Sequence, residues 1–106
     1  MANAYKTLGN DNPGAALTDL YTVPAATEAV AKFVAANRSS GPLTFSMAVS
    51  PASAAIQDPH YWFYETTIPA NDSVEVDGIS LATTDIVRVW GESGSISFNL
   101  NGVEIG

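Results

Sequence analysis

Short runs of alternating apolar and polar residues recur along the chain. Residues 43–49 and residues 95–100 place every second side chain on an apolar face, which is typical of half-buried strands. The breaks between such runs combine Gly or Pro with Asn, Asp or Ser, the residues that supply turn dihedral angles. The pattern predicts an all-β chain in which residues 1–106 form a single-domain antiparallel β-sandwich. We expect a jelly-roll or Ig-like arrangement of about seven to nine short strands.

Other runs complete the predicted set of strands. Residues 61–64 and 86–90 are apolar on both faces, as in central strands or in strands that meet a partner chain. A break at Asp77-Gly78 separates a strand over 74–76 from one over 79–81. Asn101-Gly102 is a type I′ hairpin signal, which predicts a short closing strand over residues 103–105.

Two segments allow more than one interpretation. Residues 28–36 are rich in Ala and repeat apolar residues at helical spacing, so they fit either a two-turn helix capped by Thr27 or a strand; we favour the strand, because nine residues make a marginal helix. Residues 1–16 are small and polar apart from Tyr5 and Leu8. This segment is expected to be a flexible arm or an arm that adds a strand to a neighbouring subunit.

Composition narrows the classes of function. Charged residues make up 14% of the chain, against about 25% in ordinary domains, and the formal net charge is −7. Binding to nucleic acid requires clustered positive charge, and the chain has only four Lys and Arg residues, so we expect no nucleic-acid partner. No run approaches the roughly 20 apolar residues of a membrane span, so we expect a chain without a membrane segment or secretory signal.

The residues that could act in catalysis or metal binding are better explained by structural roles. His60 is the one histidine, and without a second nitrogen ligand it is expected to be a surface residue at a strand start. Residues 73–78 resemble the first half of a calcium loop, but Thr84 stands where the closing Glu is needed, so a solvated strand face is expected. We therefore expect no enzyme, no catalytic residues, no cofactor and no metal.

Four consecutive aromatic residues form the most informative feature. On a regular strand, Tyr61 and Phe63 share one face and Trp62 and Tyr64 the other. The set fits a protein interface, packing under the chain's own loops, or a platform for sugars on which Trp62, Tyr64 or Trp90 would stack. We favour the interface, and the candidate interface residues are Tyr5, Leu8, Tyr61, Trp62, Tyr64 and Trp90.

A resemblance to a known group of proteins adds to this prediction. The phrases at residues 1–9 (MANAYKTLG), 17–27 (LTDLYTVPAAT), 37–38 (NR), 68–73 (IPANDS), 78–90 (GISLATTDIVRVW) and 97–105 (SFNLNGVEI) span nearly the whole chain in order. Together they resemble small virion structural proteins of tailed bacteriophages, including cyanophages.

The resemblance implies a non-enzymatic β-sandwich that attaches to the virus particle. Its expected role is a capsid decoration, or cement, protein that bridges and stabilises major capsid subunits; a tail or baseplate accessory protein is the alternative, and a carbohydrate-binding adhesion module is a third. It also implies partners among the virion proteins, assembly as a homo-oligomer, with a trimer favoured, and a strand over residues 29–36. The acidic composition suits the exterior of the capsid better than contact with the packaged genome.

Overall fold

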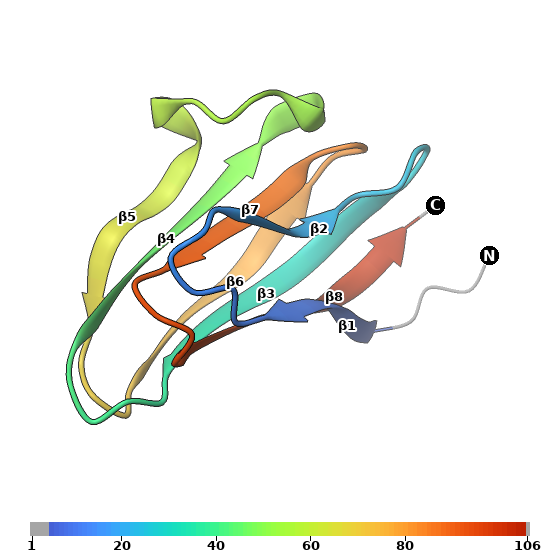
Figure 1. Cartoon of the computed structure of the whole chain (residues 1–106). Coiled ribbons are helices and arrows are strands. Elements are labelled where there is room, and N and C mark those ends of the chain that lie inside the picture. The colour runs from blue at the N-terminus through green and yellow to red at the C-terminus, as the bar shows by residue number, and fades with distance from the viewer. Residues whose placement is uncertain (1–4, 106) are drawn as a thin grey trace.

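The computed structural model describes residues 5–105, which form two four-stranded antiparallel sheets packed face to face (Figure 1). The strands are β1 (Tyr5–Asp11), β2 (Thr18–Thr22), β3 (Glu28–Asn37), β4 (Leu43–Ser50), β5 (Tyr61–Ile68), β6 (Ser73–Leu81), β7 (Ile86–Gly91) and β8 (Ile96–Ile105). Two 3₁₀ turns, η1 (Pro51–Ser53) and η2 (Asp58–His60), lie in the connection between β4 and β5.

The order of the strands defines a jelly roll. One sheet has the order β1-β8-β3-β6 and the other β2-β7-β4-β5, so most consecutive strands alternate between the two sheets. The predicted β-sandwich is confirmed, and of its two expected forms the chain adopts the jelly roll. Within residues 5–105, no helix is long and apolar enough to cross a membrane.

Phenylalanine rings fill the space between the sheets. Phe33 of β3 and Phe98 of β8 meet Phe45 of β4, with ring centroids 6.0–6.3 Å apart, and all three side chains are fully buried. Phe63 of β5 stacks on the same group, 5.1 Å from Phe45. Since these rings come from both sheets, their burial, together with that of the aliphatic core side chains, holds the sandwich closed.

The segment with two interpretations is a strand. β3 alternates buried and more exposed residues along its length, with Ala29, Ala31, Phe33 and Ala35 facing the core. It lies between β8 and β6, and both neighbours pair with it in antiparallel ladders. A helix there would leave the facing edges of both neighbours unpaired, so sheet pairing overrides the helical propensity of the alanines.

The hairpin predicted at Asn101-Gly102 is wrong, because β8 continues through both residues to Ile105. Gly102 is needed for close approach of two backbones: a Cβ atom there would lie 2.2 Å from the carbonyl oxygen of Val30. The break expected at Asp77-Gly78 is likewise a bulge inside β6, with Gly78 at φ +69° and a register shift against β3.

The described part of the expected arm is an edge strand of this chain. β1 pairs with β8, and Tyr5 enters it through backbone pairing with Val103. Leu8 is half-buried and packs against the core. Residues 1–4 of the arm lie outside the described residues, and so does the side chain of Tyr5.

A polar cluster joins the two sheets. The Tyr21 hydroxyl of β2 donates a hydrogen bond to the Glu104 carboxylate of β8, and the Lys6 ammonium of β1 lies 2.8 Å from that carboxylate. Hydrogen bonds from Lys6 and Tyr21 hold the pKa of Glu104 below its usual range. Burial, together with the Glu104 charge, raises the pKa of Tyr21. The cluster therefore stabilises the ionised form of Glu104.

Candidate interaction site

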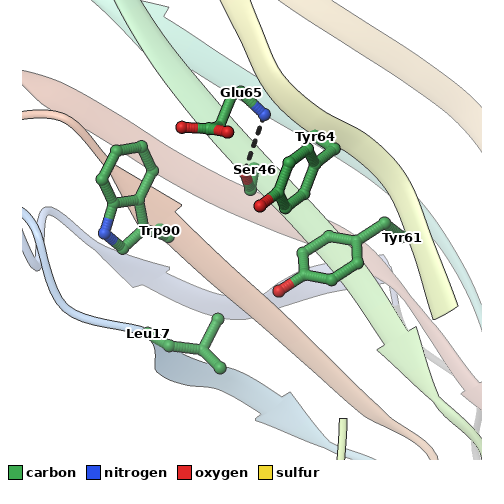
Figure 2. Close-up of a pocket in the computed structure, with 6 residues that line it drawn as sticks. All are labelled: Leu17, Ser46, Tyr61, Tyr64, Glu65 and Trp90. Carbon is green, nitrogen blue, oxygen red and sulfur yellow. Dashed lines mark hydrogen bonds between the residues drawn. The ribbon is translucent and has the colours of Figure 1, made fainter. Parts of the chain in front are cut away.

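A pocket of about 190 Å³ opens on the outer face of the β2-β7-β4-β5 sheet (Figure 2). This outer surface is called the aromatic face below. The residues that line the pocket are Leu17, Ser46, Tyr61, Tyr64, Glu65 and Trp90. Three of the six candidate interface residues, Tyr61, Tyr64 and Trp90, are thus brought together from two strands.

Irregular pairing of β5 puts the two tyrosines on the same side. Met47 pairs with Phe63 but the next residue, Ala48, pairs with Tyr61, so β5 has one extra residue at this point. Phe63 turns into the core, whereas Tyr61 meets Tyr64 edge-on with ring centroids 4.9 Å apart. The prediction that Tyr61 shares a face with Phe63 is therefore wrong, because a bulge breaks the alternation of side chains between the two faces of a strand.

A second irregularity fixes the position of Glu65. The register shifts again between Phe45 and Met47, where Ser46 stands opposite two residues of β5. The Glu65 backbone N–H donates to Ser46 Oγ at 2.9 Å, and Glu65 has φ 45°. The left-handed conformation costs a non-glycine residue about 1–3 kcal/mol, and such strain is often found at functional sites.

The opposite wall of the pocket comes from β7 and from the start of β2. Trp90 pairs with Ser46 of β4, so its indole lies across the sheet from the two tyrosines. Leu17 precedes β2 and is 45% exposed, so its apolar side chain is available to a partner at the pocket. Figure 2 shows the Trp90 indole on one side of the opening, the two tyrosine rings on the other, and Leu17 below.

The chain's own β4–β5 connection packs on part of the aromatic face. The Arg88 guanidinium donates to Ser50 Oγ and to the carbonyl oxygen of Ala54, each at 3.1 Å, and pairs with Asp19 at 2.9 Å. These contacts hold the β4–β5 connection against β7. A neighbouring pocket of about 360 Å³ is lined by Asp58 of this connection together with Tyr61 and Tyr64. The tyrosine pair therefore lies between two openings, each with one carboxylate.

The other candidate residues lie elsewhere. Trp62 is 49% exposed on β5 but does not line the pocket, and Leu8 packs on the core. Two lining residues, Leu17 and Glu65, were not among the sequence candidates. The available signal for Glu65 was its position directly after the aromatic run, whereas nothing in the sequence linked Leu17 to residues more than forty positions away.

Two further candidates have structural roles. The His60 ring accepts a hydrogen bond at Nδ1 from the backbone N–H of Gln57, 3.1 Å away, just before β5 begins. Glu75 and Asp77 are exposed on β6, as the sequence predicts for a solvated strand face, and Glu75 lies 3.8 Å from Lys32. Among residues 5–105, no group of three or more His, Cys, Asp or Glu side chains is placed to hold a metal ion.

Comparison with known proteins finds similarity among solved structures. No protein-family model matches the chain, and no curated protein sequence matches it. Among solved structures, the chain is similar to a chain from the capsid of Ralstonia phage GP4, with 14% identity, a TM-score of 0.48, and coverage of 97% of this chain and 82% of that chain. A similarity at this level carries no argument about function.

Proposed function

We propose that the chain is a structural protein of a tailed-bacteriophage virion, of the capsid decoration type, which bridges and stabilises major capsid subunits from the outside. The observation that carries the proposal is the aromatic face: Tyr64 is 64% exposed beside the Trp90 pocket. Exposed Tyr and Trp residues around a pocket are typical of the centre of protein interfaces. The ordered resemblance of the sequence to small phage virion proteins supports the same role.

The distribution of side chains also supports this role. The outer face of the other sheet, called the polar face below, exposes Ser, Asn and charged side chains, with Val30 and Ile105 as its exposed large apolar side chains. A protein that coats a particle needs one face that binds the shell and another that stays hydrated, and the two outer faces meet these needs separately. The proposal assigns no catalytic step to the chain.

Thermal rupture of particles tests the proposal. A protein that binds only the intact shell stabilises it by mass action, so particles stripped of this chain should rupture at lower temperature and recover when it is added back. The Tyr64→Ser/Trp90→Ser double variant should fail to restore the rupture temperature. Val30→Ser removes an apolar side chain that is 45% exposed on the polar face, and this variant should restore the rupture temperature fully. Equal recovery with both variants would contradict docking through the aromatic face.

Two alternative functions are separated by simple measurements. A tail or baseplate accessory protein would be present in a few to dozens of copies per particle, whereas a shell protein is present in hundreds. A carbohydrate-binding module would use Trp62, Tyr64 or Trp90 as stacking platforms. Binding on a glycan array that is lost in Trp90→Ala would favour that module over the decoration protein.

The proposal includes self-association, with a trimer favoured. Its support is Trp62, which stands half-exposed on β5, an edge strand of its sheet, away from the pocket. An exposed indole on a sheet edge is a suitable contact between copies. Sedimentation velocity should give a trimer for the wild-type chain and a folded monomer for Trp62→Ser. An unchanged mass in the variant would refute this contact.

A further inference from the structure

The pocket on the aromatic face has the composition of a cation-binding cage. Two tyrosine rings and one indole surround the opening, and the Glu65 carboxylate lies at its rim (Figure 2). Aromatic faces carry partial negative charge, so they attract ammonium and guanidinium groups that lie within about 6 Å of the ring. A carboxylate beside the rings adds direct attraction for the same ligand.

The chain's own cations do not reach this carboxylate. Among residues 5–105, no Lys or Arg side chain forms an ion pair with Glu65. Each has other partners: Lys6 with Glu104, Lys32 with Glu75, Arg88 with Asp19, and Arg38 with Ser97 and the carbonyl oxygen of Gly94. Asp58 beside the same tyrosines adds a second negative charge nearby. The site therefore presents negative charge that the described chain does not neutralise.

We propose that this pocket binds a lysine or arginine side chain that a virion partner presents, with the cationic group held between Trp90 and the tyrosine pair and directed toward Glu65. The identity of the partner rests on the proposed virion role, whereas the binding of a cationic side chain depends only on the composition of the pocket.

A titration of the isolated protein tests the chemistry. The probes are Nα-acetyl-lysine amide and Nα-acetyl-arginine amide, and the matched neutral control is Nα-acetyl-norleucine amide. The chain has two tryptophans, so NMR can follow both indole N–H signals, and Trp62 serves as an internal control. We expect a saturable shift of the Trp90 signal with a cationic probe, weaker binding at high salt, and little response of Trp62.

Variants assign the binding to the cage. Trp90→Leu should weaken binding of the cationic probe about fivefold or more, and Glu65→Gln about twofold to fivefold. Trp62→Leu should bind the probe as the wild type does. An equal response to norleucine amide, no saturable response to either cation, or equal binding by Glu65→Gln and the wild type would overturn the cation site.

Charge reversal on stripped particles tests the partner. Glu65→Lys should lose particle binding at least tenfold, whereas Asp77→Lys, which makes the same charge change on the polar face, should bind normally. If wild-type protein fails to bind particles, the virion role fails while the titration still decides whether the cage holds cations. If wild-type protein binds particles and Glu65→Lys binds equally well, the virion role stands and the cage is not its contact.

Discussion

The aromatic face and the polar face differ both in the side chains they expose and in the regularity of the strands beneath them. Under the polar face, the central strands β3 and β8 pair through ten residue pairs without a shift, and the two outer ladders, β1 with β8 and β3 with β6, shift once each. Under the aromatic face, β4 and β5 shift register twice within five pairs. A regular ladder keeps successive side chains on opposite faces of the sheet, whereas each bulge changes the face to which a side chain points. The irregular β4–β5 ladder gathers Tyr61, Tyr64 and Glu65 around one opening.

The comparison implies a division of roles. The bulges cost pairing and place Glu65 in a strained conformation, yet the side chains that they turn outward contribute little to the core. We therefore expect substitutions on the aromatic face to affect binding more than folding. Substitutions in the core should lower the stability of the fold more than they affect binding. The same holds at positions under the polar face where two backbones approach closely.

The largest difference should appear between an inward and an outward aromatic residue. Phe33→Ala removes the ring that contacts Phe45, Phe63 and Phe98, and should lower the free energy of unfolding by about 3–5 kcal/mol. Tyr64→Ala, on the aromatic face, should lower it by less than about 1 kcal/mol. Urea denaturation of both variants measures the two values. Equal losses would mean that the aromatic face is part of the folding core.

A smaller effect is expected at the glycine where two backbones approach. In Gly102→Ala the new Cβ must displace the β3 backbone at Val30, so we expect a loss of about 2–3 kcal/mol. Gly78→Ala is the matched control, because its surroundings are open and only its positive φ is strained, at a cost of about 1–2 kcal/mol. Thermal denaturation that ranks the control as the less stable variant would contradict the close approach of β8 and β3.

The smallest effect concerns the cluster that joins the sheets. Because the pKa of Glu104 is lowered by folding, its carboxylate stabilises the fold above the ordinary Glu pKa of about 4.3, and this contribution is lost as pH falls through the lower, folded value. Glu104→Gln should cost about 1 kcal/mol at neutral pH and flatten the acid limb of the stability profile. Glu75→Gln, on the exposed polar face, should leave the profile unchanged. If the stability of Glu104→Gln falls at low pH just as that of the wild-type protein does, the cluster is not the source of the pH dependence.

The sequence predicted the regular parts of the molecule well. Period-two alternation was enough to identify the β-sandwich and the inward side chains of β4 and β8, because β4 pairs with β7, and β8 with β3, without a register shift. The pattern failed at Gly102, because a glycine that permits close packing of two backbones can follow Asn in the sequence just as a hairpin glycine does. It also failed at Gly78, because a bulge and a turn have the same local sequence pattern. Both errors arise because the role of a glycine depends on contacts that are distant in sequence.

The candidate site was only partly predictable for a similar reason. Tyr61, Tyr64 and Trp90 stood out as aromatic residues in strands, but the register of β5 against β4 decides which of them meet. Leu17 joins the pocket only through the pairing of β2 with β7, a contact that local pattern does not encode. Residue type therefore identified the aromatic character of the site, whereas the topology of the jelly roll determines which residues line it.

Cryo-electron microscopy of the parent particle would show both where the chain lies and which of its faces contacts the shell. We expect regular density for this jelly roll over the outside of the capsid shell, with Tyr64 and Trp90 toward the shell and the polar face toward solvent. Density on the shell with the polar face inward, or a particle without this chain, would contradict it.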